Sequence, residues 1–184
     1  MSVSPRRTVS VAPNGAEYPL PDASASGSEL DRLRDWAVPD RPVVAIQGVG
    51  FVGSAVAVAV ASASRSGGEA IYSVVGVDLP SSESFWRVAR ANEGVPPLPS
   101  DDEDLARAHR EGVLAMGNLT FTWLPEAYRL ADVIVVDINL DVDKREAGDY
   151  DVDLGPYTSA IRVIGQHMRT DALVLIESTV PPGT

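Results

Sequence analysis

The residue types that could do chemistry gather first in a short glycine-rich stretch. Gly48, Gly50 and Gly53 follow the apolar run Val43–Ile46 and precede a long pattern of small apolar residues. A Gly-x-Gly-x-x-Gly turn between a strand and a helix suits a dinucleotide, because its glycines allow a tight turn, close approach of the pyrophosphate, and close helix packing. Backbone N–H groups at the helix start can then hold phosphate. We therefore predict that Gly48, Val49, Gly50, Phe51, Val52 and Gly53 bind a dinucleotide.

An acid follows at the matching place. Asp78 ends the apolar stretch Ile71–Val77 and lies 25 residues after Gly53. A carboxylate there accepts hydrogen bonds from a ribose diol and repels a 2′-phosphate, which favours NAD over NADP. The alternative is a purely structural glycine turn, with Asp78 only capping a strand. The agreement of the turn, its context and the acid favours cofactor binding.

Polar residues follow two later strands at the same expected edge of the sheet. Asn139 comes after Asp132–Ile138, and Ser178 and Thr179 come after Leu173–Glu177. Ligands of open α/β sheets bind at the carboxyl ends of the strands, so these side chains could meet a nicotinamide or a substrate. On local grounds alone, a Ser-Thr pair after a strand is more often a turn.

Other candidate groups indicate structure more than chemistry. His109 and His167 fall on expected helices without a partner in the sequence, and the acids Asp101–Asp104 suit the first turn of a helix. The chain has no cysteine, so it forms no disulfide, no thiolate metal site and no cysteine nucleophile. We expect no metal site.

Composition limits the partners. The net charge is −11, which argues against nucleic acid or an anionic membrane surface as a partner. Arg6 and Arg7 precede no apolar segment that would make a secretory signal, and the longest apolar stretch, near Ala55–Ala61, is too short to span a bilayer. We expect a soluble, cytoplasmic protein.

The remaining pattern predicts the elements that position these groups. Residues 1–27 are rich in Ser, Pro, Ala and Gly and are expected to be disordered. Strands are expected at 43–47, 71–78, 119–122, 132–138 and 173–177, helices at 28–38, 51–64, 85–92, 101–111 and 154–168, a helical turn at 125–130 and a polar loop at 139–151. Alternation of strands and helices predicts an α/β fold: a Rossmann-type doubly wound parallel sheet of order 3-2-1-4-5, truncated after its fifth strand. We divide the chain into a tail with a short helix, 1–40, and a dinucleotide-binding domain, 41–184.

Five segments in order carry a family resemblance: Gly-Val-Gly-Phe-Val-Gly at 48–53, Val-Val-Gly-Val-Asp at 74–78, Asn-Glu-Gly-Val-Pro-Pro-Leu at 92–98, Ala-Asp-Val-Ile at 131–134, and Glu-Ser-Thr-Val-Pro-Pro-Gly-Thr at 177–184. From about Val43 to Thr184 the chain resembles the N-terminal NAD-binding domain of the UDP-glucose/GDP-mannose dehydrogenase family. The resemblance implies oxidation of a nucleotide sugar at C6, from alcohol to carboxylate, with NAD as cofactor. It implies that Ser178 and Thr179 lie beside the nicotinamide and that Thr179 is an active-site residue that helps position a water or the catalytic acid.

The chain departs from that pattern in several places. The nucleophilic cysteine of the family is absent, and the later segments that carry the family's lysine, asparagine and cysteine are not present. Leu140-Asp141 stands where the family usually has Thr-Pro, and Glu83 stands where some relatives have a basic residue, for which Arg87 is a possible substitute. We expect an NAD-binding chain that is catalytically incomplete alone, either a homo-oligomer or joined by a partner chain with the missing domains. The alternative is a non-catalytic NAD-binding or interaction module; the closing motif argues against an unrelated dehydrogenase.

Overall fold

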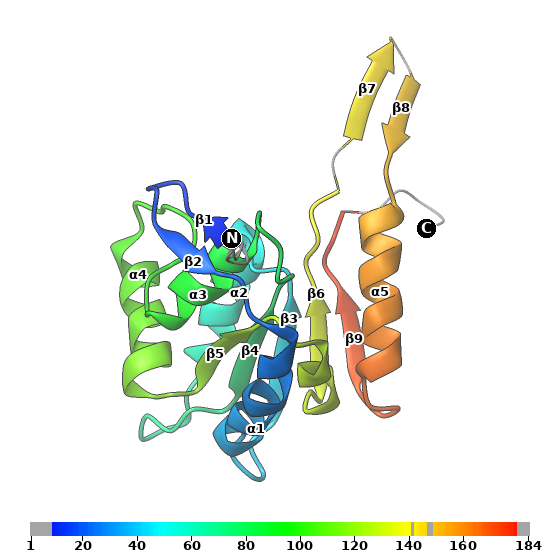
Figure 1. Ribbon diagram of the computed structural model, residues 1–184. Coiled ribbons are helices and arrows are strands. Elements are labelled where there is room, and N and C mark those ends of the chain that lie inside the picture. The colour runs from blue at the N-terminus through cyan, green and yellow to red at the C-terminus, as the bar shows by residue number, and fades with distance from the viewer. Residues whose placement is uncertain (1–8, 141, 147–148, 180–184) are drawn as a thin grey trace, which may run out of the picture.

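A five-stranded parallel sheet forms the centre of the protein (Figure 1). The computed structural model describes residues 9–140, 142–146 and 149–179. The strands of the sheet are β3 (Val43–Gln47), β4 (Ser73–Val77), β5 (Leu119–Thr122), β6 (Val133–Val136) and β9 (Leu173–Ile176). Their spatial order is β5-β4-β3-β6-β9, and every neighbouring pair is parallel. This confirms the Rossmann-type fold and the predicted strand order.

Helices cover both faces of the sheet. They are α1 (Ser26–Trp36), α2 (Phe51–Ala61), α3 (Phe85–Asn92), α4 (Glu103–Arg110) and α5 (Gly155–His167), with 3₁₀ turns at η1 (Ala23–Ala25) and η3 (Pro125–Arg129) and a π-helical turn, η2 (Glu111–Ala115). Residues of α2 and α3 share one buried cluster with β3, β4 and β5. Residues of α1, η3 and α5 share the other with β3, β4 and β6. The strands β3, β4, β5 and β6 are buried on both sides, which is why most of them appear in the sequence as apolar runs rich in Val and Ile. β9, at the edge of the sheet, is mostly exposed.

The N-terminal segment is folded where disorder was expected. β1 (Val9–Val11) and β2 (Glu17–Pro19) pair as an antiparallel hairpin. The hydroxyl of Ser10 donates to the carbonyl of Ser82 at 2.8 Å and accepts from the Trp86 N–H at 3.0 Å. The prediction of disorder is therefore wrong for residues 9–27, while residues 1–8 lie outside the described residues. The division at residue 40 stays a prediction.

The cause of that error is that strands of three residues leave almost no periodicity. The sequence did contain one signal, the pair Asn14-Gly15, which is common in hairpin turns because glycine readily adopts a positive φ. Gly15 has a φ of +84°. The hairpin is held by tertiary contacts, because Tyr18 and Leu20 pack against the core cluster of α2 and α3.

A second hairpin replaces much of the expected polar loop at 139–151. β7 (Val142–Glu146) pairs antiparallel with β8 (Asp149–Val152), and Figure 1 shows it extending away from the sheet. Its polar sequence has no apolar alternation that would have predicted strands.

No helix within the described ranges is long and apolar enough to cross a membrane. The cytoplasmic location stays a prediction.

Candidate functional site

The glycine turn lies at the carboxyl edge of the sheet, between β3 and α2. Gly48 has a φ of +98°, and its N–H donates to the carbonyl of Val77 at 2.9 Å. A Cβ at Gly48 would overlap the carbonyl oxygen of Asp137, just after β6. The turn is therefore pressed between the ends of β4 and β6, and a side chain does not fit at its first position.

The other two glycines shape the start of α2. Gly50 is the N-cap residue, and no side chain caps the helix there. A Cβ at Gly50 would meet no atom within 4 Å, whereas a Cβ at Gly53 would overlap the carbonyl oxygen of Gly48. Open space thus borders Gly50, while Gly53 lets the helix pack close to the turn. The N–H groups and positive dipole end of the helix favour an anion at such a place.

Asp78 reaches the glycine turn from the end of β4. Its Oδ2 accepts from the N–H of Val49 at 3.2 Å, and its Oδ1 accepts from the N–H of Leu79 at 2.7 Å. Arg87 of α3 lies 3.7 Å from Oδ2. Burial raises the pKa of Asp78 above its ordinary value, against the opposing effects of the hydrogen bonds and of Arg87. The carboxylate is one-tenth exposed, at 11%, so a ligand in the adjoining cleft can still reach it.

A second acid, Asp137, lies at the helix start. The N–H of Gly53 hydrogen-bonds to its carboxylate. Burial raises the pKa of Asp137, the hydrogen bond from Gly53 lowers it, and the negative charge of Glu177 raises it further. Sequence reasoning did not single out this residue, although an acid directly after an apolar strand was visible. It places negative charge where an anionic ligand would bind.

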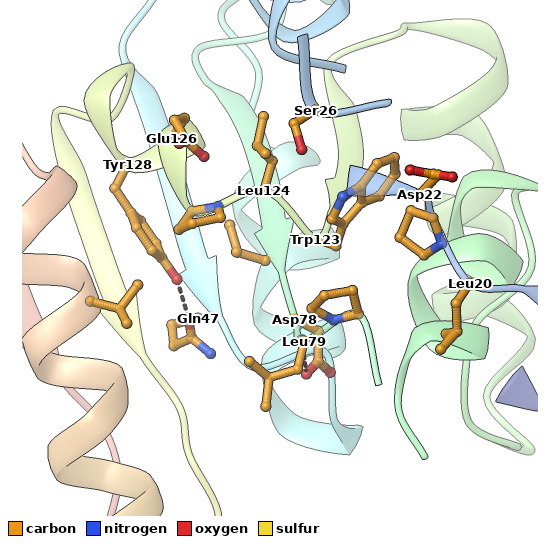
Figure 2. A pocket seen from close by; sticks show the side chains of 15 residues that line it. Leu20, Asp22, Ser26, Gln47, Asp78, Leu79, Trp123, Leu124, Glu126 and Tyr128 are labelled. Carbon is orange, nitrogen blue, oxygen red and sulfur yellow. Dashed lines mark hydrogen bonds between the residues drawn. The ribbon is translucent and has the colours of Figure 1, made fainter. Parts of the chain in front are cut away.

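Three adjoining cavities make one groove along the carboxyl edge. The middle one, about 340 Å³, is lined by the glycine turn, Asp78, Arg87 and α5. A second, about 580 Å³, shares Gln47, Asp78, Leu79 and Val163 with it (Figure 2). A third, about 430 Å³, shares Gly50 and residues 137–139 with the middle one. The groove runs across the ends of β4, β3, β6 and β9, the place where ligands bind in such sheets.

The remaining predicted residues line the far end of this groove. Asn139 lines the middle and third cavities, and Ser178 and Thr179 line the third together with Phe51 and Val52. The hydroxyl of Ser178 accepts from the N–H of Ile138 at 2.8 Å, which joins the segments after β6 and β9. Thr179 is exposed. All predicted site residues thus meet in one groove except Gly53, which supports the turn from within; their binding roles stay predictions.

Two residues that were expected to have structural rather than chemical roles, His109 and Asp102, make structural contacts. His109 is buried, stacks on Phe121 at 5.4 Å between ring centroids, and hydrogen-bonds the carbonyl of Ala91 at 2.9 Å. Burial lowers the pKa of His109. Asp102 caps α4 by accepting from the N–H groups of Asp104 and Leu105, as expected of a solvated helix start. Among the described residues, no group of His, Asp and Glu could hold a metal.

Several groove residues were missed because they come from segments without a motif. Leu20, Asp22 and Ser26 lie before the first strand of the sheet, and Trp123 and Leu124 follow β5. Gln47 accepts a hydrogen bond from the hydroxyl of Tyr128 within the groove wall. The only available signal for the β5 residues was their position after a strand, at the edge that binds ligands.

The groove fits a dinucleotide. It contains an uncapped helix start beside open backbone at Gly50, an acid beside that turn, and an adjoining cavity on each side. The acid suits a ribose diol, and the N–H groups suit a pyrophosphate.

Comparisons with known proteins point the same way. The UDP-glucose/GDP-mannose dehydrogenase family, NAD binding domain, matches residues 43–184. The UDP-N-acetyl-D-mannosamine dehydrogenase of Pyrococcus horikoshii is 33% identical over 141 residues, which are 77% of this chain and 29% of that protein.

Solved structures are similar over the same domain. The NDP-N-acetyl-D-galactosaminuronic acid dehydrogenase of Methanosarcina mazei Go1 matches with a TM-score of 0.67 and 25% identity, over 84% of this chain and 31% of that one. The UDP-glucose dehydrogenase of Pyrobaculum islandicum matches with a TM-score of 0.61 and 28% identity, over 80% of this chain and 32% of that one. The chain therefore spans less than a third of the length of these relatives.

Proposed function

Because the chain belongs to the UDP-glucose/GDP-mannose dehydrogenase family and contains its NAD-binding domain, we propose that it is the NAD-holding part of a nucleotide-sugar 6-dehydrogenase. The observation that carries this proposal is the placement of Asp78 against the glycine turn, at the middle of a groove that ends at Ser178 and Thr179. The substrate would be a UDP- or GDP-sugar, oxidised at C6 from the alcohol to the carboxylate.

The middle of the groove binds the phosphates and one ribose. Gly50 leaves room for the pyrophosphate at the N-terminal end of α2, where no side chain caps the helix and negative charge is stabilised. Asp78 accepts hydrogen bonds from the ribose diol and disfavours a 2′-phosphate. Some relatives have a basic residue at the position of Glu83. In this chain Arg87, which lies beside Asp78 and is 33% exposed, takes over that role and contacts the adenosine.

The other end of the groove holds the reacting groups. NAD bound there would supply the acceptor for the hydride that leaves the sugar. Asn139 and Ser178 bind beside the nicotinamide, and the hydroxyl of Ser178 fixes the backbone after β6 by its hydrogen bond from Ile138. Thr179, exposed at the edge of the third cavity, positions a water or the catalytic acid.

This chain alone is catalytically incomplete in our proposal. The second oxidation in the family uses a cysteine thiol as a nucleophile, and the chain has no cysteine. The missing nucleophile, and much of the sugar site, would come from a partner chain or from further domains. We also propose that the chain can form a homo-oligomer, although further copies of a chain without cysteine would not supply the thiol.

Binding of NAD tests the proposal directly. Calorimetric titration should show NAD binding to the unmodified chain, weaker binding of NADP, and loss of binding in Asp78→Ala. Equal NAD binding to the unmodified chain and to Asp78→Ala, or no binding to either, would refute the cofactor assignment. UDP-glucose, GDP-mannose and UDP-N-acetylmannosamine should each give no measurable turnover with the chain alone, and robust turnover would refute its incompleteness.

A second candidate function is a non-catalytic NAD-binding or interaction module. The pair Leu140-Asp141, in place of the family's usual Thr-Pro, favours it. Turnover restored by a cysteine-bearing sugar-binding chain would favour the dehydrogenase; NAD binding that never leads to turnover with such a chain would favour the module.

A further inference from the structure

The segment before the family's domain builds one wall of the groove. The match to the family begins at residue 43, yet Leu20, Pro21, Asp22 and Ser26 line the 580 Å³ cavity. This segment is fixed to the domain by the hydrogen bonds of Ser10 to α3 and its preceding turn, and by packing of Leu20 against the core. The wall is therefore an ordered part of the fold.

A second part of the wall comes from the segment after β5. Figure 2 shows Trp123 and Leu124 on one side of the cavity and Asp78 and Leu79 on another, with Leu20 and Asp22 beside them. The Trp123 ring is held edge-on against Phe85, with centroids 5.7 Å apart. Fixed apolar surfaces of this kind suit a flat ring, since such pockets bury most of a ligand's surface against hydrophobic and aromatic groups.

The charges of the lining exclude the phosphate end of a ligand. Asp22, Asp78 and Glu126 line the cavity, and no lysine or arginine of the described part of the chain does. Carboxylates repel phosphate and accept hydrogen bonds from an amine. The part of a ligand that enters here is therefore not anionic and carries N–H donors.

The 580 Å³ cavity opens into the middle of the groove, and this connection indicates which part of the ligand it holds. The cavity shares Asp78 and Leu79 with the cleft that contains the glycine turn. A ribose bound at Asp78 has its phosphates on the turn side and its base on the other. We propose that the cavity holds the adenine base of the cofactor and that residues 20–26 form its outer wall, a subsite built by a segment outside the family's domain. This inference rests on the proposed function.

Calorimetry on the full chain with matched variants tests it. Leu20→Ala removes part of the wall and should weaken binding of NAD and of ADP-ribose about fivefold. Val11→Ala, an exposed change on the hairpin that precedes Leu20, should leave both affinities unchanged. Ser26→Trp fills the cavity from the start of α1 and should weaken NAD at least about tenfold, with an unchanged melting temperature as evidence of folding.

The base itself is tested with nicotinamide hypoxanthine dinucleotide, in which a carbonyl replaces the adenine amine. The unmodified chain should bind it about tenfold more weakly than NAD, because carboxylates line the cavity. If the unmodified chain binds NAD but Leu20→Ala and Ser26→Trp bind it equally well, this inference fails and the proposed function stands. If both variants instead weaken UDP and leave ADP-ribose unchanged, the cavity belongs to the sugar nucleotide and the inference is overturned. Failure of the unmodified chain to bind NAD would refute the proposed function itself.

Discussion

The carboxylate of Asp78 accepts a hydrogen bond from the N–H of Val49 at 3.2 Å, so the acid at the end of β4 also fixes the glycine turn. Asp78 thus has two effects on the groove. It presents a carboxylate to a ribose, and it holds the turn in the shape that a pyrophosphate needs.

We therefore expect Asp78→Asn to weaken NAD binding about 10- to 100-fold, the range for hydrogen bonds to a charged group. NADP should lose less, because the repelling charge is gone, so the preference for NAD should shrink. Calorimetry with both nucleotides measures this, and Asp104→Asn on the exposed start of α4 is the control. An unchanged ratio of NAD to NADP affinity would contradict this role of Asp78.

The sequence predicted the sheet and most of the groove because these features depend on local patterns. Runs of Val and Ile are required by strands that are buried on both faces, and the glycines are required by overlaps of backbone atoms at Gly48 and Gly53. Asp78 followed from its place at the end of a strand. In each case a short segment contains the whole physical cause.

Features that depend on contacts between distant segments were not predicted. The hairpin at residues 9–19 is held by Ser10 against residues 82–86, and strands so short have no usable period. The wall made by Leu20 and Trp123 joins segments about a hundred residues apart. Asp137 was overlooked because its importance comes from the nearby helix start, which belongs to another element.

Removing the charge of Asp137 should change the affinity for NAD in the opposite direction to removing the charge of Asp78. Its carboxylate occupies the start of α2, close to the expected pyrophosphate, so Asp137→Asn should strengthen NAD binding about fivefold, the factor for about 1 kcal/mol of repulsion. Calorimetry at low salt, where repulsion is least screened, gives the clearest measurement. Glu177→Gln, more distant from the turn, should have a smaller effect. Weaker NAD binding in Asp137→Asn would show that this carboxylate contributes to the site.

The same acid makes stability depend on pH. The pKa of Asp137 is raised by burial in the folded protein, so folding favours the protonated form. Its contribution to stability is present below the unfolded pKa and is lost as the pH rises through the folded pKa. Asp137→Asn should therefore raise the melting temperature at pH 7 and have little effect near pH 3. Scanning calorimetry at both values checks this, and an equal shift at both would contradict the assigned ionisation.

Gly48→Ala should destabilise the fold more than a positive φ alone explains. A Cβ at Gly48 would overlap the carbonyl oxygen of Asp137, whereas at Gly117, with a φ of +63°, it would meet nothing within 4 Å. Backbone strain alone costs about 1–3 kcal/mol, so Gly117→Ala should lose that amount and Gly48→Ala clearly more. Urea unfolding of the two variants gives the comparison. Equal losses would mean that the turn can move away from β6.

The open edge of the sheet predicts self-association of this chain. β9 is the edge strand of the described sheet, and Leu173, Leu175 and Ile176 are 55%, 42% and 43% exposed. Val174 packs with the cluster under α5, so by alternation Leu173 and Leu175 face the other side of the sheet. Unpaired strand backbone beside exposed apolar side chains promotes edge-to-edge association.

Sedimentation velocity should therefore show larger species as the concentration rises. Leu175→Lys should shift the association about tenfold toward monomer, because a charge on an edge strand opposes pairing. Leu114→Lys, another exposed leucine that lies in η2 and far from this edge in the sheet order, should leave the association unchanged. A clean monomer at high concentration would count against the prediction. An equal effect of both lysines would show that loss of exposed apolar surface in general, and not the β9 edge, governs the association.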